Sequence, residues 1–127
     1  MIPAELGPRA LRDLRTILVR SVDRFGEEAA DRYSRLIRQS LRDIEENPER
    51  FGSMTRPALL AGGARTYHIS FSRRNAPKPG VQEPRHFLLY RRKWDMKRKR
   101  EIIEVARILH DSTDLARHLP PDYRPRN

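Results

Sequence analysis

The side chains best suited to binding a charged partner are concentrated in one short stretch of the second half of the chain. Seven of the ten side chains in residues 91–100 are cationic, Trp94 lies among them, and Asp95 is the only acid. Cations at this density attract phosphates or carboxylates, and an exposed tryptophan can stack on a nucleic-acid base. The alternative interpretation is a solvated loop that improves solubility. The candidate contact residues are Arg91, Arg92, Lys93, Trp94, Lys97, Arg98, Lys99 and Arg100.

Metal and cofactor chemistry have little support in the sequence. Histidines are the only soft metal ligands, because the chain has no cysteine. His110, Asp114 and His118 are spaced by four, and on a helix they would share one face, as metal ligands can. They follow a predicted strand, so we expect no metal site and assign His110 and Asp114 to hydrogen bonding. No glycine-rich phosphate loop is present either, and we therefore expect no cofactor.

Length and charge restrict the class of protein. A chain of 127 residues is long enough for a single domain. The first 50 residues carry equal numbers of acidic and basic side chains, so the net charge of +10 belongs to residues 51–127. This asymmetry favours an acidic partner, such as nucleic acid or an acidic protein segment. No apolar run approaches the roughly 20 residues that span a bilayer, so we expect a soluble, cytoplasmic protein with no membrane partner.

A helical hairpin is predicted over residues 8–47. Apolar residues recur at spacings of three and four in both halves of this region. Gly26 can adopt the left-handed conformation that ends a helix, and the acids after it suit the first turn of the next helix. Asn47 and Pro48 end the second helix. The stripes expected to face inward are Leu11, Leu14, Ile17, Leu18, Val22 and Phe25 in the first helix, and Ala30, Tyr33, Ile37, Leu41 and Ile44 in the second.

Three strands are predicted over residues 65–110. Residues 66–71 alternate, whereas residues 86–91 and 102–109 are rich in β-branched and aromatic side chains. Residues 75–84 hold three prolines and a glycine, so we expect an exposed loop there. The predicted fold is α+β, an N-terminal antiparallel helical hairpin packed on a small antiparallel sheet of about three strands. A single domain would cover residues 1–119, and residues 120–127 would form an irregular tail.

Three stretches resemble the ParE branch of the RelE/ParE toxin superfamily. They are the turn RFGEEAADRY, the helix end ENP and the closing strand that continues into ILHDSTDLARHLP. The resemblance covers residues 6–119 and implies a RelE/ParE-like fold. Three features depart from the family pattern, one of which is the unusually basic connection over residues 94–100. The first strand is reduced to residues 1–6, which include Pro3, and the 75–84 segment is longer than the usual tight turn.

The resemblance implies the toxin of a type II toxin–antitoxin system, of the kind linked to plasmid stabilisation and growth arrest. ParE-like members inhibit DNA gyrase by protein–protein contact, and RelE-like members cleave messenger RNA on the ribosome. A cognate ParD-like antitoxin would lay an acidic segment across the toxin, forming a hetero-oligomer. Arg65, Arg73 and Arg74 flank the alternating strand and are the candidates for that contact. These arginines could instead protect sheet edges from aggregation.

For the enzymatic alternative, the resemblance to RelE-like members implies clustered basic residues and a terminal tyrosine that activate the ribose hydroxyl and stabilise the phosphorane charge. Arg85, Arg107 and His110 are its candidate catalytic residues. The family's tyrosine position falls near Leu119, and Tyr123 lies beyond the matched region. We therefore expect that the chain has no catalytic residue and that it inhibits gyrase. The alternatives are a ribosome-dependent endoribonuclease and a degenerate member that binds its antitoxin without being toxic.

The side of the last strand on which Arg107 lies matters to this alternative. Simple alternation predicts that Arg107 shares a side with Ile103, Val105 and Leu109. A charge on that side would need a partner to offset its burial.

Overall fold

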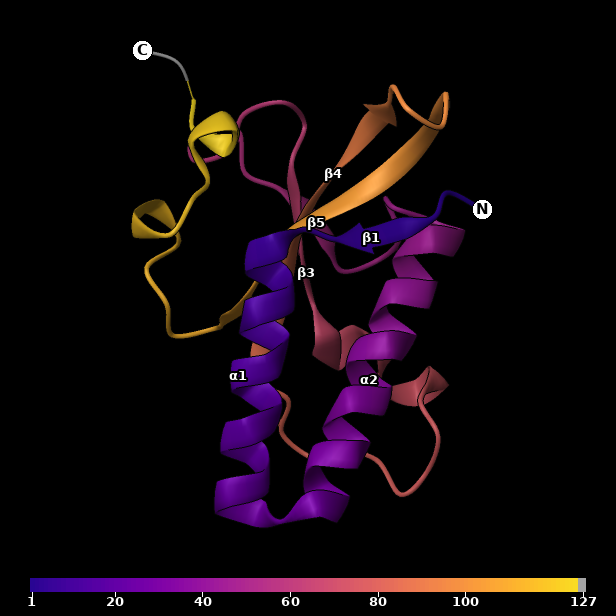
Figure 1. Ribbon diagram of the computed structural model, residues 1–127, viewed down its shortest axis with the longest axis vertical. Coiled ribbons are helices and arrows are strands. Elements are labelled where there is room, and N and C mark those ends of the chain that lie inside the picture. The colour runs from indigo at the N-terminus through magenta and orange to yellow at the C-terminus, as the bar shows by residue number, and fades with distance from the viewer. Residues whose placement is uncertain (126–127) are drawn as a thin grey trace.

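Two antiparallel helices, α1 (Pro8–Phe25) and α2 (Glu27–Glu46), form the predicted hairpin in the computed structural model, which describes residues 1–125 (Figure 1). Gly26 joins them at a φ of +91°, a left-handed value that side chains with a Cβ rarely adopt. Its N–H donates to the Val22 carbonyl at 2.9 Å and so closes the last turn of α1. The glycine therefore sets the tight reversal that makes the two helices neighbours.

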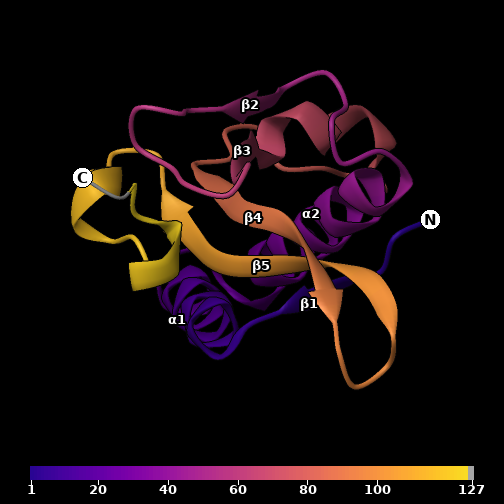
Figure 2. The ribbon, with the colours of Figure 1, turned by 90° about the horizontal axis from the view of Figure 1, so that it is seen from above.

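The hairpin packs on a five-stranded mixed sheet in the order β1-β5-β4-β3-β2 (Figure 2). The strands are β1 (Ala4–Leu6), β2 (Ser53–Thr55), β3 (Arg65–His68), β4 (His86–Asp95) and β5 (Arg100–His110). β1 runs parallel to β5, and all other neighbours are antiparallel. The α+β prediction and the reduced first strand are confirmed. The sheet exceeds the predicted three strands because β1 and β2 are too short for alternation to reveal.

The predicted strand over residues 66–71 ends earlier than expected. β3 stops at His68, and residues Ile69–Asn75 form a 3-10 helix, η1. The His68 ring starts this turn, since its Nδ1 accepts from the Ser70 N–H at 3.2 Å and lies 2.7 Å from the Ser70 hydroxyl. Ile69 and Phe71 therefore do not continue the strand, although Ile69 is buried. A side chain that caps the turn overrides the period-two pattern.

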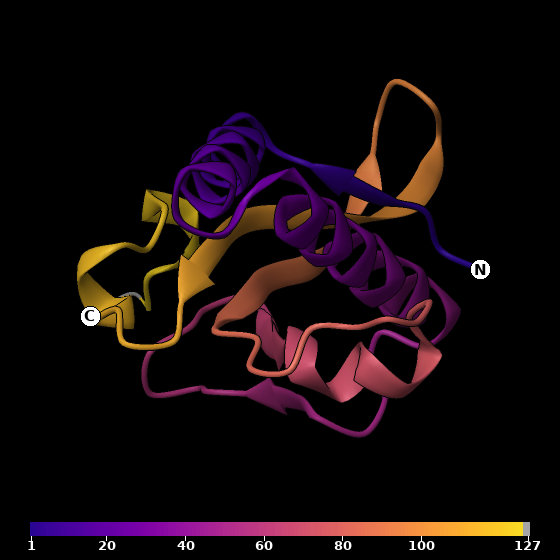
Figure 3. The same cartoon turned by 90° about the horizontal axis from the view of Figure 1, so that it is seen from below.

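β4 and β5 extend much further than the sequence predicted and take up most of the basic stretch. Their connection is only the turn at residues 96–99, in which Lys99 has a φ of +52°. The Asp95 carboxylate accepts from the Lys97 and Arg98 N–H groups at 3.0 and 3.3 Å. An aspartate that caps its own turn allows the strands to run to the tip. The end of this hairpin projects clear of the domain in Figures 1 and 3.

Side chains are buried on both faces of the sheet. The cluster between helices and sheet comprises Ala10, Leu36, Ile37, Ile44, Tyr67, Ile69, Leu88, Tyr90, Ile103, Val105 and Ile108. A smaller cluster on the opposite face comprises Leu60, Ala64, Leu89, Ala106, Leu119 and Tyr123. The loop before β3 and the C-terminal segment supply its cover. Both faces of the central strands are therefore buried. The surfaces that remain for function lie at the ends of the sheet, on the helical hairpin and on the β4–β5 hairpin.

The two helices bury their apolar stripes unequally. Ala30, Ile37 and Ile44 of α2 are buried, whereas Ala10 is the only buried residue of α1. Three members of the stripe predicted for α1 are exposed, namely Leu11, Val22 and Phe25, and Phe25 is 72% exposed. The far half of the hairpin extends beyond the strands (Figure 1), so the sheet covers only part of α1. Apolar side chains near Gly26 are left available to line a cleft.

A β-bulge in the pairing of β4 with β5 leaves Ala106 as an extra residue on β5. The bulge reverses the alternation, so that Val105 and Ile108, three residues apart, both belong to the cluster beneath the helices. Arg107 consequently lies on the opposite side from Ile103 and Val105. The prediction that these residues share a side is wrong, because alternation cannot anticipate an inserted residue.

The C-terminal segment is more ordered in its contacts than its composition suggested. Residues Leu115–Arg117 and Pro121–Tyr123 form 3-10 turns, η2 and η3. Tyr123 is buried, and its carbonyl accepts from the Ala61 N–H at 2.9 Å. Part of the predicted irregular tail thus seals the second face of the sheet. Its last two residues, 126 and 127, lie outside the described part of the chain.

Candidate functional site

The stretch of residues 91–100, which we name the basic ribbon, carries all eight candidate target-contact residues on β4, its turn and the start of β5. Three of its cations, Arg91, Arg92 and Lys93, pair with carboxylates on β5. Arg92 Nη2 lies 2.7 Å from Glu101 Oε1, and Lys93 Nζ lies 3.1 Å from Glu104 Oε2. Asp95 is therefore not the only acid that offsets the charge. Glu101 and Glu104, which lie on β5 just past the stretch, reduce its net charge further.

The tip of the basic ribbon keeps most of its positive charge. Arg98 reaches Glu5 of β1 at 2.6 Å. Lys97, Lys99 and Arg100 are exposed, and no carboxylate in residues 1–125 lies within ion-pair distance of them. Trp94 is 56% exposed and stands among these cations. The tip can therefore present both charge and an aromatic surface to a partner.

Arg91 differs from the other residues of the basic ribbon because it is part of the folded body. Its Nε lies 3.4 Å from Glu104 Oε1, and its Nη2 bonds to the Asp122 carboxylate. The guanidinium carbon lies 4.4 Å from the centroid of the Tyr123 ring, a cation–π distance. Arg91 thus holds the C-terminal segment against the sheet. It is poorly placed to meet a target.

The three arginines predicted to bind an antitoxin do not lie together. Arg65 is part-buried, donates to the Ser53 hydroxyl at 3.2 Å and lies 3.8 Å from Glu49, so it stabilises the β2–β3 edge. Arg73 and Arg74 are exposed on η1 and line a hollow of about 530 Å³ with Lys78. Arg73 and Arg74 are accessible to a partner, and Arg65 is largely committed to the fold.

The three candidate catalytic residues, Arg85, Arg107 and His110, do not form one cluster either. Arg107 makes a two-pronged ion pair with Asp13 of α1, with N–O distances of 2.8 and 3.0 Å. Asp13 also accepts from the Ile108 N–H at 2.9 Å, and so caps the edge of β5 beyond the end of β1. Arg85 and His110 lie elsewhere, on either side of Asp111, which Arg85 Nη2 approaches to 2.9 Å and His110 Nδ1 to 3.6 Å. Arg107 is therefore held away from the other two.

A network that the sequence did not reveal surrounds Asp111. His68 Nε2 lies 3.1 Å from the Asp111 carboxylate, and the rings of His86 and His110 meet edge to face with centroids 5.2 Å apart. Three of the four histidines thus gather at the ends of β3, β4 and β5. Burial alone would raise the pKa of Asp111, but the hydrogen bonds from His68 and Arg85 outweigh it and lower that pKa. His86 and His110 stood at the ends of predicted strands, but His68 stood inside one, so no sequence pattern marked the three as a cluster.

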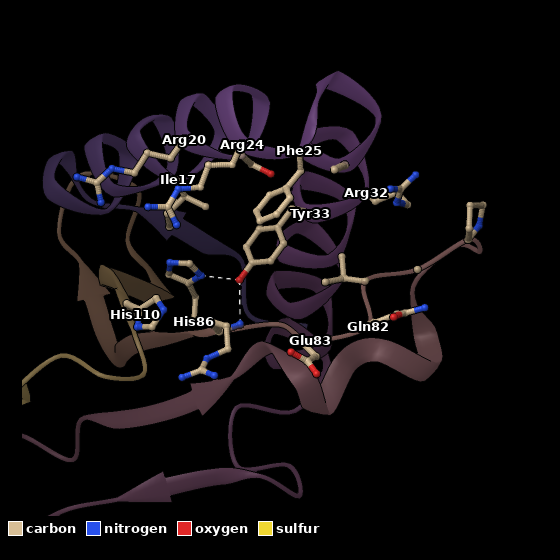
Figure 4. Close-up of a pocket in the computed structure, with 16 residues that line it drawn as sticks. Ile17, Arg20, Arg24, Phe25, Arg32, Tyr33, Gln82, Glu83, His86 and His110 are labelled. Carbon is tan, nitrogen blue, oxygen red and sulfur yellow. Dashed lines mark hydrogen bonds between the residues drawn. The ribbon is translucent and has the colours of Figure 1, made fainter.

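Tyr33 of α2 joins this network to the helices. Its hydroxyl accepts from the Arg85 N–H at 3.0 Å and lies 2.5 Å from His86 Nδ1 (Figure 4). The hydroxyl and Nδ1 share one hydrogen, and the tautomer of His86 decides which of the two atoms donates it. Burial, helped by the nearby His110, lowers the pKa of His86 to about 4. His86 is therefore neutral at physiological pH, and burial also raises the pKa of Tyr33.

A cleft of about 1080 Å³ lies against this network, between the far half of the helical hairpin and the loop before β4. Apolar side chains from both walls line it, among them Ile17, Phe25 and Val81. Arg20 and Arg24, one turn apart on α1, lie along the same wall (Figure 4). With Arg32 of α2 they have no ion-pair partner among residues 1–125, although Arg85 does. We name this feature the arginine cleft.

The tyrosine that RNA cleavage would require has no accessible counterpart in the C-terminal segment. Leu119, near the position that the family uses, is buried. Tyr123 is also buried, and its hydroxyl donates to Glu104 Oε1 at 3.0 Å. Burial and the neighbouring Glu104 carboxylate raise the pKa of Tyr123 well above its usual range. This hydroxyl is therefore protonated at physiological pH and is bonded inside the fold.

Neither α1 nor α2 contains the long apolar stretch that a membrane-crossing helix needs, and no other described segment supplies one.

Comparison with known proteins agrees with the fold and the sequence motifs. A family model described as the ParE toxin of type II toxin-antitoxin system, parDE, matches residues 4–115. The match takes in both helices and all five strands. A search of curated proteins found no match. The chain therefore belongs to the ParE toxin family of type II toxin–antitoxin systems.

Proposed function

We propose that this ParE-family toxin inhibits DNA gyrase by direct contact and is neutralised by a cognate ParD-like antitoxin in a hetero-oligomer. The proposal gives the toxin no catalytic residue and a site of action in the cytoplasm, where gyrase works. The observation that carries it is the division of the enzymatic residues. Arg107 is bound to Asp13, away from Arg85 and His110, and the one tyrosine near the chain end is buried.

The basic ribbon is the proposed contact with the target. Its tip projects from the domain and retains Lys97, Lys99 and Arg100 without acidic partners among the described residues. A rigid β-hairpin loses little conformational entropy on binding, since its strands are already paired. The tip therefore has the charge, exposure and stiffness that inhibition by contact requires.

The arginine cleft is the proposed contact with the antitoxin, together with Arg73 and Arg74 beside it. The two hollows share residues 79–82 as a common wall. An acidic segment with apolar residues on one side could bury them against Phe25 and Val81 and pair its carboxylates with Arg20 and Arg24. Removing arginines from water without a counter-charge is costly, so a bound acidic segment would gain from both effects.

A supercoiling and cleavage-complex assay with purified, antitoxin-free protein tests the proposal. We expect gyrase to lose supercoiling activity or to accumulate cleaved DNA, and we expect added antitoxin to reverse this. A gyrase that is unaffected at toxin concentrations well above the enzyme concentration would contradict the proposal.

RNA cleavage is the second candidate, because Arg85 and His110 do meet at Asp111 beside His86. Incubation with translating ribosomes and mapping of transcript ends distinguishes it. Our proposal predicts intact transcripts. If the unmodified protein cleaves transcripts and the double variant Arg85→Ala/His110→Ala does not, the protein is an endoribonuclease and gyrase inhibition is not its function. Tight antitoxin binding with neither effect would identify a degenerate, non-toxic member.

A further inference from the structure

The end of the basic ribbon is free of the rest of the sheet. β3 pairs with β4 only as far as Tyr90, and β1 pairs with β5 only from Ile103 onward. Residues 93–95 and 100–102 therefore pair with each other alone. Beyond the sheet the hairpin is a two-stranded antiparallel ribbon with a four-residue turn at its tip, and Figure 3 shows it standing away from the helices.

The charges on this free end suit a linear array of anions. Lys97, Lys99 and Arg100 have no carboxylate partner among residues 1–125. Arg98 is engaged with Glu5 and Asp95, but its side chain is 53% exposed. Exposed pairs of this kind contribute little to stability, so a phosphate can replace either carboxylate. Four cations around one turn are thus available to phosphates.

The same tip carries two large apolar side chains in contact with solvent. Trp94 is 56% exposed and Met96 is 78% exposed. An acidic peptide would need a groove in which to bury its own apolar residues, and both hollows described above lie elsewhere on the molecule. A nucleic acid needs no groove in the protein, because it supplies one.

We propose that the free end of the basic ribbon, residues 93–102, binds duplex DNA by entering the major groove. The major groove of B-form DNA admits a two-stranded β-ribbon. Lys97, Lys99 and Arg100 then contact phosphates on the groove walls, and Trp94 and Met96 contact sugars and base edges within it. This inference deepens the target contact under the proposed function, since gyrase holds duplex DNA, but binding to free DNA needs no gyrase. The two proposals can therefore fail separately.

Fluorescence anisotropy with a labelled DNA duplex of about 20 base pairs tests the inference over a range of salt concentrations. We expect a dissociation constant near the micromolar range, typical of contacts made mainly to phosphates. In the variant Lys97→Ala/Lys99→Ala/Arg100→Ala the slope of log affinity against log salt should become shallower by about 2 to 3. The affinity itself should fall at least tenfold at 0.1 M salt.

A matched control removes the same charge elsewhere. Arg9, Arg12 and Arg15 are exposed on α1, and their triple alanine variant should change the salt slope by less than about 1. Equal losses in the two variants would overturn the inference, because only net charge would then matter. So would undetectable DNA binding by the unmodified protein. Circular dichroism melts of both variants check that the fold is retained.

Two further probes separate duplex DNA from other polyanions. Double-stranded RNA has a deep, narrow major groove that a β-ribbon cannot enter, so it should bind several-fold more weakly. Vesicles rich in phosphatidylglycerol should not compete with DNA at equal phosphate concentration. Tighter binding to the RNA or to the vesicles would overturn the proposal.

Trp94→Ala should lower DNA affinity about threefold or more while leaving the salt slope unchanged, because it removes contact area without charge.

Discussion

The arginine cleft and the basic ribbon are both positively charged, but they hold their charge in different ways. The ribbon offsets much of it with carboxylates on β5 and β1, and neither of the two hollows described above borders it. In the cleft, Arg20, Arg24 and Arg32 lack such partners within residues 1–125 and surround a cavity with apolar walls. Two surfaces of the same sign therefore differ in shape and in how their charge is compensated.

This difference separates the two proposed roles. A cavity with apolar walls and unpaired arginines fits a short amphipathic acidic segment, whose apolar side chains can be buried there. A stiff, projecting ribbon fits a large polyanionic surface that it can enter. The net charge of +10 alone could not have distinguished these partners, because it contains no geometry.

Charge reversal in the arginine cleft should have the largest effect. The variant Arg20→Glu/Arg24→Glu should weaken antitoxin binding at least a hundredfold, because each change removes an attraction and introduces a repulsion at a desolvated contact. Isothermal titration with the purified antitoxin measures this. Arg9→Glu/Arg12→Glu, on the exposed first turns of α1, is the control with equal charge change. A similar loss of antitoxin affinity in the control would mean that the net charge of the protein, and not the cleft, determines binding.

Paired and unpaired arginines should differ in their effect on stability. Asp13→Asn should lower the free energy of unfolding by about 2 kcal/mol, because it leaves the part-buried Arg107 without its counter-charge. Arg20→Ala should change that free energy by no more than about 0.5 kcal/mol. Urea titrations of both variants give these values. If Arg20→Ala proves as destabilising as Asp13→Asn, the cleft arginines belong to the scaffold.

Acid should destabilise the network beside the cleft through His86. The pKa of His86 is about 4 in the folded chain, against about 6.5 when unfolded, so the unfolded chain takes up its proton first as pH falls. The stability that this group contributes is present above pH 6.5 and is lost as pH falls toward 4. Because the ring is not fully buried, we expect about 1 to 2 kcal/mol between pH 7 and pH 4.5.

His86→Asn is the matched variant for this pH effect, since its amide takes the place of Nδ1 and can hydrogen-bond Tyr33 without titrating. Its loss of stability between pH 7 and pH 4.5, measured by denaturant unfolding, should be smaller than that of the unmodified chain. Folding lowers the pKa of Asp111, so the stability that this carboxylate contributes is present throughout this range and is lost only at lower pH, below the usual pKa of a carboxyl group. Identical pH profiles for the two proteins would show that His86 carries no such linkage.

The smallest expected effect comes from removing one of the ion pairs that partly neutralise the basic ribbon. Glu101→Gln should release Arg92, whose ion pair of 2.7 Å is exposed, and should raise affinity for duplex DNA about twofold to threefold. Anisotropy at low salt measures the change. A weaker complex after this substitution would mean that the pair holds the ribbon in its binding geometry.

Much of the scaffold could be predicted because it depends on local rules. Gly26 after an apolar stripe, followed by acids, specified the helical hairpin, and composition located β4 and β5. Features controlled by single side chains could not be predicted in this way. The His68 cap ends β3 early, Asp95 allows β4 and β5 to run to the tip, and the bulge at Ala106 moves Arg107 to the other side.

The candidate sites were predictable only in part for a related reason. The basic ribbon is contiguous in sequence, so its charge was visible, but its acidic partners lie on β5 and β1. The arginine cleft is assembled from α1, α2 and the loop before β4, and no contiguous pattern marks it. Tyr33 was predicted to face inward, yet its bond to His86 joins residues 53 positions apart. Contacts of this range depend on the topology of the whole domain.

The most direct test of the account measures gyrase inhibition and antitoxin binding side by side for two variants. In Lys97→Ala/Lys99→Ala/Arg100→Ala, gyrase inhibition should fall about tenfold while antitoxin affinity stays within about twofold of the unmodified toxin. In Arg20→Glu/Arg24→Glu, inhibition should persist and the antitoxin should no longer reverse it. If each variant loses both properties to the same degree, the two surfaces are not separate and the account is wrong.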